Sequence, residues 1–433
     1  MTQQIPPVRG MNDVLPSEIG AWQHFEACTR ELLAAYGYEE IRTPLLEHTE
    51  LFKRAIGEHT DVVGKEMYTF SDRGGDSLTL RPEATAGIVR ALISNGLLRG
   101  ARHKLWCLGP MFRHEAPQAG RYRQFWQVDV EAIGCPGPDV DAELIALGAR
   151  LWQRIGVTGL TLELNSLGTP ESRRAYRMHL VEYLKAHEAR LDADSRRRLD
   201  VNPLRVLDSK NPQMQELISG APQLTEHLDA ESRAHFEELC AMLRSLGVSY
   251  RLNPRLVRGL DYYTRTVFEW ITDSDIAQNA VCSGGRYDGL VAQLGGDATP
   301  AIGFAMGVER LVALLTASGR VPAARPPDVY VVVGGAAVAG EALRIVERLR
   351  SERPALRFEL HVGGGNFKAQ FRRADRSGAP LALVVGADEL ARGVVGVKPL
   401  RADSGQSECP LAQLASGVDA ALAAAAGAGA ARA

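Results

Sequence analysis

The segment FWQVDVE, residues 125–131, carries chemically active side chains at every second position. Its odd positions hold an aromatic ring, an amide and two carboxylates, namely Phe125, Gln127, Asp129 and Glu131. Side chains of a β-strand alternate between two faces, so these four would share one face and apolar residues the other. A sheet with one solvated face is the ordinary explanation of such a pattern. A solvated face would however rarely carry side chains such as Phe125 and Glu131, or Arg113 on the preceding strand. The pattern therefore favours the floor of a binding pocket.

The stretch from residue 96 to residue 123 is strongly basic. Its six cations, against the single acid Glu115, are Arg99, Arg102, Lys104, Arg113, Arg121 and Arg123. A local positive field suits phosphate groups, although it does not separate a nucleotide from a nucleic acid, and a chance fluctuation of charge is the alternative. The Gly64–Lys65 pair lacks the flanking residues of a Walker A loop. ATP chemistry would therefore rely on arginine side chains.

Two later segments also combine glycine with chemically active residues. In RGLDYYTRTVFEW, Arg258 stands beside Gly259, where backbone can approach a ligand closely, and two tyrosines follow at 262 and 263. In GFAMGVERL, a helix is expected to begin at Gly307 and to carry Arg310 in its first turn. An arginine there opposes the helix dipole, so it calls for a compensating anion.

Composition excludes several classes of protein. The chain has 433 residues, 50 Lys+Arg against 52 Asp+Glu, and 45% hydrophobic residues, which excludes a collagen, a simple coiled coil, a disordered protein and a uniformly basic nucleic-acid binder. The six cysteines are at least 28 residues apart, so we expect free thiols in a reducing cytosol and no metal site. The N-terminus does not resemble a signal peptide, and no apolar run of about 18 residues predicts a membrane span.

These segments need elements to position them, and the periodicity predicts several. The first two are an amphipathic helix over 17–36 capped by Ser17 and an extended piece, at an edge or interface, that contains Pro44. A hairpin of strands 104–115 and 123–133 follows. Next come a helical insertion over 169–247, with apolar faces that include Leu191 and Leu246, and strands over 249–257 and 266–272. A proline-rich linker near 320–328 follows, and strands then alternate with helices as in a small parallel α/β domain. We therefore expect domains 1–325 and 326–420, with a flexible Ala/Gly tail over 421–433.

Several segments together resemble the class II aminoacyl-tRNA synthetases. Pro44 matches motif 1, Phe112-Arg113-His114-Glu115 matches motif 2, and Gly307, Glu309 and Arg310 match motif 3, in which Ala305 replaces a glycine. The more specific segments TLRPEAT, LVRGLDYYTRTVFE and SGGRYDGL resemble signatures of the histidyl-tRNA synthetase family, of the bacterial type. This resemblance covers nearly the whole chain.

The resemblance implies an α+β fold: a class II antiparallel sheet flanked by helices, with a helical insertion and a C-terminal α/β anticodon-binding domain. It implies that L-histidine and ATP, with Mg2+, give histidyl-adenylate and pyrophosphate, and that histidine then passes to the 3′ end of tRNA(His). It also implies a cytoplasmic homodimer that pairs through motif 1, without a resident metal or a membrane.

The family's site residues carry over to matching positions. For histidine these are Glu83, Ala84, Thr85, Arg113, Gln127, Glu131, Arg258, Tyr262 and Tyr263; for ATP they are Arg113, Glu115, Arg121, Phe125 and Arg310; for tRNA they are Gln118, Arg123, Lys368, Arg372 and Arg373. Glu83, Thr85 and Gln127 would hold the ammonium, and Glu131 and Tyr263 the imidazole nitrogens. Arg113 and Arg258 would be catalytic. Ala84 and Ala116 depart from the glycine and arginine that the family often has there.

Two other functions compete with this one. An inactive synthetase paralogue that senses histidine as a regulatory subunit of ATP phosphoribosyltransferase would be expected to lack the C-terminal domain and parts of the signatures, but this chain keeps Arg113, Arg258 and Arg310. A generic nucleic-acid-binding module would not explain a polar pocket face with paired acids and arginines.

Overall fold

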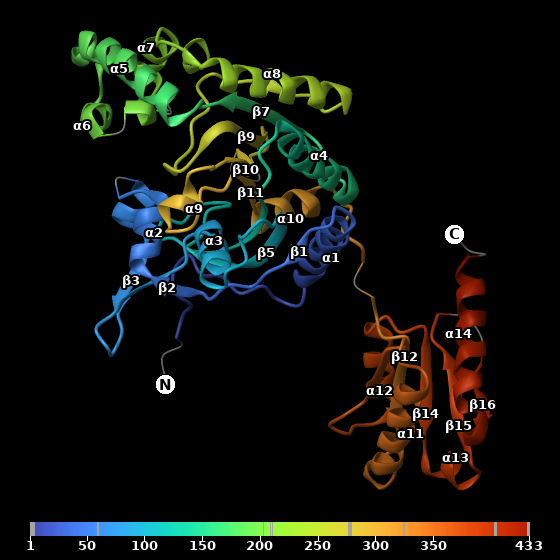
Figure 1. The fold of residues 1–433 in the computed structure, drawn as a ribbon. Coiled ribbons are helices and arrows are strands. Elements are labelled where there is room, and N and C mark those ends of the chain that lie inside the picture. The colour runs from blue at the N-terminus through green and yellow to red at the C-terminus, as the bar shows by residue number, and fades with distance from the viewer. Residues whose placement is uncertain are drawn as a thin grey trace. The chain divides into compact units, whose positions relative to one another are not determined.

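The computed structural model describes residues 5–430 except 59, 202, 208, 210, 276–278, 324 and 402–404. The chain divides into two compact units, residues 1–322 and 323–433 (Figure 1). The first unit contains the hairpin and every segment on which chemistry was predicted, apart from the basic helix of the second.

A largely antiparallel sheet forms the centre of the first unit. In its described part the sheet has eight strands in the order β1 (Glu39–Glu40), β5 (His103–Phe112), β6 (Gln124–Ile133), β11 (Ala301–Gly307), β10 (Ala280–Arg286), β9 (Thr264–Thr272), β7 (Leu160–Ser166) and β8 (Arg251–Leu252). Only the outer pairs β1–β5 and β7–β8 are parallel among them. The predicted hairpin is confirmed as β5 and β6, although β5 ends at Phe112 and leaves Arg113 and Glu115 beyond the strand.

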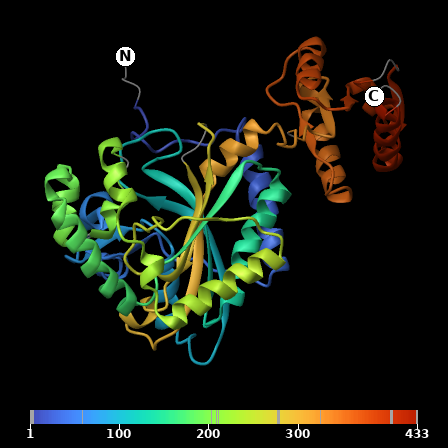
Figure 2. The ribbon, with the colours of Figure 1, turned by 90° about the horizontal axis from the view of Figure 1, so that it is seen from above.

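Helices cover both faces of this sheet (Figure 2). One face packs against α1 (Ile19–Ala35), α4 (Pro138–Ile155), α8 (Ala230–Ser245) and α10 (Val308–Ala317). The other face packs against α2 (Thr49–Ile56), α3 (Thr85–Ser94), α5 (Pro170–Ala186), α6 (Ala193–Val201), α7 (Gln215–Ser219) and α9 (Leu290–Gln293). Val128 and Val130 are fully buried in the first of these cores, as the alternation along β6 predicts.

Smaller elements complete the first unit. A three-stranded antiparallel sheet contains β2 (Leu46–His48), β4 (Ser77–Leu80) and β3 (Tyr68–Ser71), and a π-helix spans Val62–Glu66. Pro44 lies between β1 and β2 and belongs to neither strand. Helix α1 begins at Ile19 with no side-chain cap, so the prediction that Ser17 caps it is wrong.

The predicted helices of the 169–247 segment are present, but they belong to two different cores. Tyr176, Leu180 and Leu184 of α5 are fully buried on the pocket side of the sheet, whereas α8 packs on the opposite side. Leu246 is 55% exposed, because α8 ends at Ser245 and the apolar face does not extend past it.

The second unit is an α/β domain with a mixed sheet. Its described strands are ordered β13 (Phe358–Leu360), β12 (Val329–Val333), β14 (Leu381–Val385), β15 (Val394–Pro399) and β16 (Ser407–Pro410), and its helices are α11 (Ala339–Glu352), α12 (Phe367–Arg376), α13 (Ala387–Ala391) and α14 (Leu414–Ala430). The prediction of a parallel sheet holds for β12, β13 and β14, but β15 and β16 are antiparallel. The expected flexible tail over 421–433 is helical as far as residue 430, because α14 extends through it and alanine favours a helix. Residues 431–433 lie outside the described residues.

A half-buried carboxylate joins the first and last helices of the insertion. Asp229 caps the N-terminus of α8 by accepting a hydrogen bond from the Ser232 backbone N–H at 2.7 Å, and it also accepts from the hydroxyls of Thr169 and Ser172 before and within α5 at 2.9 and 2.5 Å. We expect Asp229→Ala to lower the free energy of unfolding of this unit by about 2 kcal/mol, since a helix cap and two further hydrogen bonds are lost. Urea denaturation measures the change.

The matched control for this prediction is Glu226→Ala, three residues away and exposed, which should change stability by less than about 0.5 kcal/mol. Burial alone would raise the pKa of Asp229, but hydrogen bonds hold the pKa well below its usual range. The stabilisation that Asp229 contributes is therefore complete above the pKa of an aspartate in the unfolded chain, about 4, and decreases as the pH falls below that value. Equal effects of the two substitutions would contradict the capping role.

Candidate active site

A cavity of about 400 Å3 lies over the polar face of β6 in the first unit. Its lining includes twelve of the residues predicted from the sequence: Glu83, Thr85, Arg113, Glu115, Arg121, Phe125, Gln127, Glu131, Arg258, Tyr262, Tyr263 and Arg310. They come from β6, the start of α3, the 113–122 loop, the segment before β9 and the first turn of α10. The fold thus brings together segments up to about 230 residues apart in the sequence.

Strand register explains why Gly303, within β11, is a glycine. Glu131 on β6 lies opposite Gly303 on β11. A Cβ atom at Gly303 would overlap the Glu131 carboxylate. The glycine therefore leaves the space in which this carboxylate enters the cavity.

Acidic side chains occupy one end of the cavity. Glu83 accepts hydrogen bonds from the backbone N–H groups of Thr85 at 2.8 Å and Ala86 at 2.9 Å, where they begin α3. Asp129 and Glu131 are completely or almost completely buried beside it. Burial, and to a smaller extent the negative charge of Glu83, raise the pKa of Asp129 to about 8. Burial also raises the pKa of Glu131 well above its ordinary value.

This end of the cavity is suited to a cation that donates hydrogen bonds. Within the described residues, the Asp129 carboxylate oxygens and the Gln127 Oε1 atom are buried without a hydrogen-bond partner. Buried acceptors without donors are unfavourable, and carboxylates close together repel one another unless a positive charge or a proton compensates them. An ammonium group would supply both the positive charge and the donors.

Glu131 is held by two hydroxyl groups. Thr85 Oγ1 donates to Glu131 Oε1 at 2.6 Å, and the Tyr287 hydroxyl donates to Oε2 at 2.5 Å. Thr85 was expected to face an ammonium group, and its hydroxyl is instead used in orienting Glu131. Tyr287 was not among the predicted site residues, although the segment SGGRYDG that contains it was singled out. Its ring also meets that of Tyr262, with centroids 5.7 Å apart.

The two arginines predicted to be catalytic reach the middle of the cavity. Arg113 donates from Nε to the Pro82 carbonyl at 2.9 Å, and its guanidinium lies 5.4 Å from the centre of the Phe125 ring. Arg258 forms an ion pair with Glu269 of β9, a partner that the sequence did not indicate. Both guanidinium groups are therefore fixed by neighbours on one side.

The end of the cavity that was assigned to ATP is basic. Arg121 pairs with Glu115 at 2.9 Å, and Arg310 donates from Nε to the Gly120 carbonyl at 2.9 Å. Burial, with help from Arg121 and Arg113, lowers the pKa of Arg310 to about 10. A cation that is destabilised by burial and by other cations would be stabilised by an anion, as its position in the helix also suggested.

Some predicted site residues lie elsewhere. Ala84 is fully buried in the apolar core beneath the cavity and does not line it. Gln118 is exposed on the 113–122 loop, and Arg123 donates from Nε to the Glu115 carbonyl at 3.2 Å at the base of that loop. Lys368, Arg372 and Arg373 are exposed on α12 of the second unit.

Comparison with known protein families gives two matches along the chain. A family model described as Histidyl-tRNA synthetase matches residues 10–311. A second, described as Anticodon binding domain, matches residues 328–420. Together they cover both compact units.

Individual relatives agree with these matches. A histidine–tRNA ligase of Halorhodospira halophila is 57% identical over 407 residues, which cover 94% of this chain and 96% of the relative. The solved structure of apo histidyl-tRNA synthetase from S. aureus is 35% identical, covers 95% of this chain and 99% of its own, and superposes with a TM-score of 0.79. A structure from Bacillus halodurans described as an ATP phosphoribosyltransferase regulatory subunit/histidyl-tRNA synthetase has a TM-score of 0.63 at 23% identity, over 86% of this chain and 97% of that one, and so shares the fold.

Proposed function

The chain belongs to the histidyl-tRNA synthetase family and acts as an aminoacyl-tRNA ligase for histidine, and from this premise we propose how its cavity performs the reaction. One observation carries the proposal: a single cavity places a buried acidic cluster, centred on Asp129, next to arginines that include Arg113 and Arg258. Histidine has a cationic ammonium and an anionic carboxylate, and ATP is a polyanion. The two ends of the cavity are complementary to these charges.

The acidic end receives histidine. Its ammonium donates to Glu83, Gln127 and the neighbouring Asp129, whose buried oxygens then gain donors. Glu131 accepts a hydrogen bond from one imidazole nitrogen, and the Tyr263 hydroxyl bonds the other. Thr85 and Tyr287 both donate hydrogen bonds to Glu131, so its carboxylate acts as an acceptor. It therefore accepts a further hydrogen bond from an imidazole N–H.

The arginines bind the reacting groups. The histidine carboxylate, already ionised, attacks the α-phosphorus of ATP, a bond to the bridging oxygen breaks, and pyrophosphate leaves. Arg113 and Arg258 hold the carboxylate and the α-phosphate in line and neutralise charge that develops on the phosphoryl oxygens. No general base is needed in this step.

The nucleotide occupies the basic end. Arg121, Glu115 and Arg310 contact it, and adenine stacks on Phe125. Arg113 lies over that ring in the structure, so stacking on the same face requires its guanidinium to move toward the phosphates. ATP binds as its Mg2+ complex. Glu66 and Glu115 are the carboxylates at this end of the cavity that suit the ion.

The second step moves histidine to tRNA. A 3′-terminal ribose hydroxyl attacks the carbonyl carbon of histidyl-adenylate and gives its proton to a phosphate oxygen, the bond between the carbonyl carbon and the bridging phosphate oxygen breaks, and AMP leaves. We propose that Gln118, which is exposed on the 113–122 loop, contacts the acceptor end, and that Arg123 supports the loop through its hydrogen bond to the Glu115 carbonyl. We place the catalytic domain at residues 1–325, the anticodon-binding domain at 326–420 and a terminal segment at 421–433.

The second unit offers a binding surface for the anticodon. Lys368, Arg372 and Arg373 are exposed on α12, and none has an ion-pair partner among the described residues. Arg373 also lines a groove with Tyr330 and His361, whose side chains hydrogen-bond at 2.8 Å. Tyr330 and His361 are only 2% and 6% exposed and shape the floor of this groove, so the exposed cations of α12 are the groups that suit the phosphates of a single-stranded RNA loop.

We expect alanine at Lys368, Arg372 and Arg373 together to raise the KM for tRNA in histidine charging about tenfold or more, because phosphate contacts are lost. Histidine-dependent pyrophosphate exchange should stay at the wild-type rate, since the substitutions lie outside the catalytic unit. Charging and exchange assays on the same preparations measure the two effects.

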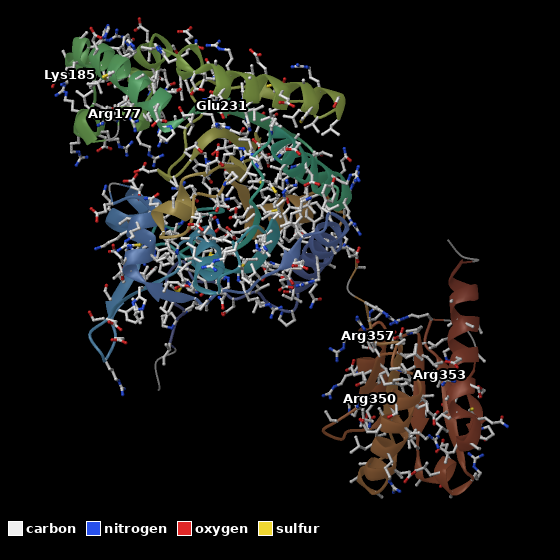
Figure 3. The ribbon with its side chains drawn as sticks, viewed as in Figure 1. Arg177, Lys185, Glu231, Arg350, Arg353 and Arg357 are labelled. Carbon is white, nitrogen blue, oxygen red and sulfur yellow. The ribbon has the colours of Figure 1, made fainter. Side chains whose placement is uncertain are left out.

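A matched control uses three arginines of the same unit, Arg350, Arg353 and Arg357 (Figure 3). Arg350 pairs with Glu347, Arg353 pairs with Asp419, and Arg357 donates to a backbone carbonyl at 2.8 Å. Alanine at these three positions removes the same charge but should change the KM for tRNA much less. Equal effects of the two triple variants would contradict a specific site on α12.

We further propose that two copies of the chain associate through the segment around Pro44. Leu45 and Leu46 beside it are 41% and 40% exposed, so the segment presents two adjoining apolar side chains that a second copy would cover. Light scattering at micromolar concentration should give the mass of a dimer, and a monomer would contradict the proposal.

No helix in the described part of the chain is long and apolar enough to span a membrane. A cytoplasmic location is a prediction from the family resemblance. The regulatory-subunit alternative is not favoured, because that relative shares only the fold at 23% identity, whereas the histidine–tRNA ligase is 57% identical.

A further inference from the structure

Tyr287, whose hydroxyl holds the Glu131 carboxylate, stands between two charged residues. Arg286 before it is the last residue of β10, and Asp288 follows it. The Tyr287 backbone N–H donates to the Ala301 carbonyl at 2.8 Å, and the Asp288 carboxylate accepts from the Ala301 backbone N–H at 3.0 Å. The tyrosine therefore reaches the cavity from a short segment that is bonded to the first residue of β11.

The Arg286 guanidinium is fully buried and is held by several acceptors. It donates to Asp288 Oδ1 at 3.1 Å and to the carbonyls of Cys135 and Gly137 at 3.1 and 2.5 Å. Its Nη2 and Nε atoms lie 2.7 and 3.1 Å from the two carboxylate oxygens of Asp141 on α4. Arg286 thus ties the end of β10 both to α4 and to Asp288.

Strand pairing alone does not set the direction of the side chains here. The pairing of β10 with β9 changes register between Gly285 and Arg286, which marks a bulge or irregularity. A Cβ atom at Gly285 would lie 2.5 Å from the Thr266 carbonyl oxygen, so the backbones approach closely at this point. A bulge redirects the side chains that follow it, and other contacts must then hold them.

The charged residues around Tyr287 do not themselves face the substrates. Tyr287 lines the cavity, whereas Arg286, Asp141 and Asp288 are absent from its described lining. The side chains of Arg286 and Asp141 are both 0% exposed. Transfer of two charges out of water often costs more than their attraction returns, so such a pair is weak evidence of stabilisation. A planar guanidinium with five donors does, however, fix its acceptors in one arrangement.

We propose that Arg286, held by Asp141 and Asp288, is a positioning residue for histidine recognition: it sets the direction of Tyr287, which in turn orients Glu131. This role rests on the proposed function, since the pocket concerned is the one assigned to histidine. The Tyr287 hydroxyl lies 2.5 Å from Glu131 Oε2, and a hydrogen bond weakens steeply when its angle changes. A disturbance of the Arg286 contacts should therefore reach histidine through the Tyr287 hydroxyl.

A double-mutant cycle of Arg286→Lys with Tyr287→Phe tests this role through equilibrium binding of histidine. Lysine keeps the charge but lacks the planar fork that serves these acceptors. We expect Arg286→Lys alone to raise the Kd for histidine about tenfold, and less than about twofold in the Tyr287→Phe background, where the hydroxyl that it positions is already absent. The KM for ATP at saturating histidine should change less than about twofold.

Two further variants separate positioning from stability. Thr266 Oγ1 donates to Asp141 Oδ2 at 2.7 Å, so Thr266→Val removes a buried hydrogen bond to the same carboxylate and leaves the Arg286 contacts in place. It should lower the temperature of unfolding but change the Kd for histidine less than about twofold. Asp288→Asn keeps an acceptor oxygen, so it is the milder substitution for the cycle if Arg286→Lys fails to fold. It should raise the Kd about threefold, and only while the Tyr287 hydroxyl is present.

Three results would overturn the proposal. An equal rise in Kd with and without the Tyr287 hydroxyl would show that Arg286 does not act through it. An unchanged Kd in folded Arg286→Lys would show that Tyr287 needs no such support. A rise in Thr266→Val as large as that in Arg286→Lys would show that only the stability of this region matters. A wild-type chain that binds no histidine would instead contradict the proposed function itself.

Discussion

Replacing Arg258 with alanine is expected to lower the rate of histidine-dependent pyrophosphate exchange at saturating substrates about a thousandfold, while the Kd for histidine rises less than about tenfold. The guanidinium binds the histidine carboxylate in the ground state, but it contacts the phosphoryl oxygens most strongly when charge develops on them. Its loss therefore affects the rate more than the binding. Exchange kinetics and calorimetric binding of histidine measure the two quantities.

Two companion variants make this prediction specific. Arg258→Lys keeps the charge but loses the planar pair of donors, so its rate should lie between those of the wild type and the alanine variant. Glu269→Gln removes the ionic partner of Arg258 and leaves the arginine, so it should slow exchange far less than Arg258→Ala. An equal fall in rate and in histidine affinity for Arg258→Ala would contradict a role in the transition state.

The substitution Glu131→Gln is expected to weaken histidine binding at least a hundredfold. A glutamine amide offers one acceptor oxygen, whereas Thr85, Tyr287 and the imidazole N–H all need to donate at this position. One donor is then left facing the amide N–H2 in a buried site, and an unpaired buried polar group costs about 1–3 kcal/mol in addition to the lost charged contact. Equilibrium binding of histidine measures the effect.

Tyr287→Phe provides the comparison for Glu131→Gln. It removes one of the two hydroxyls that orient the carboxylate and keeps the carboxylate itself, so affinity should fall about tenfold. Unchanged histidine affinity in Glu131→Gln would contradict the assignment of Glu131 to the imidazole. A larger effect of Tyr287→Phe than of Glu131→Gln would indicate that the tyrosine, not the carboxylate, provides specificity.

The sequence predicts well those features of the site that depend on local periodicity. Alternation along 125–131 correctly separates Gln127, Asp129 and Glu131 from the buried Val128 and Val130, because strand geometry alone decides which face a side chain takes. The fold class is confirmed as well, since segment patterns and family signatures point the same way.

Features that depend on contacts between distant segments were not predicted. Tyr287 lies 156 residues from Glu131, and Arg205 enters the cavity from an insertion whose pattern shows only amphipathic helices. The ion pair between Arg258 and Glu269 depends on how the segment before β9 folds back on that strand. Likewise, β15 and β16 are short and contain glycine, cysteine and proline, so periodicity gave no strong strand signal.

This one cavity is expected to activate histidine with ATP. Incubating the pure, folded chain with ATP, Mg2+, labelled pyrophosphate and single amino acids tests it most directly. Label should appear in ATP only when histidine is present, and it should decline sharply with Arg258→Ala at the same histidine concentration. Absence of histidine-dependent exchange in a folded preparation would contradict the claim, and so would exchange that another amino acid supports equally well.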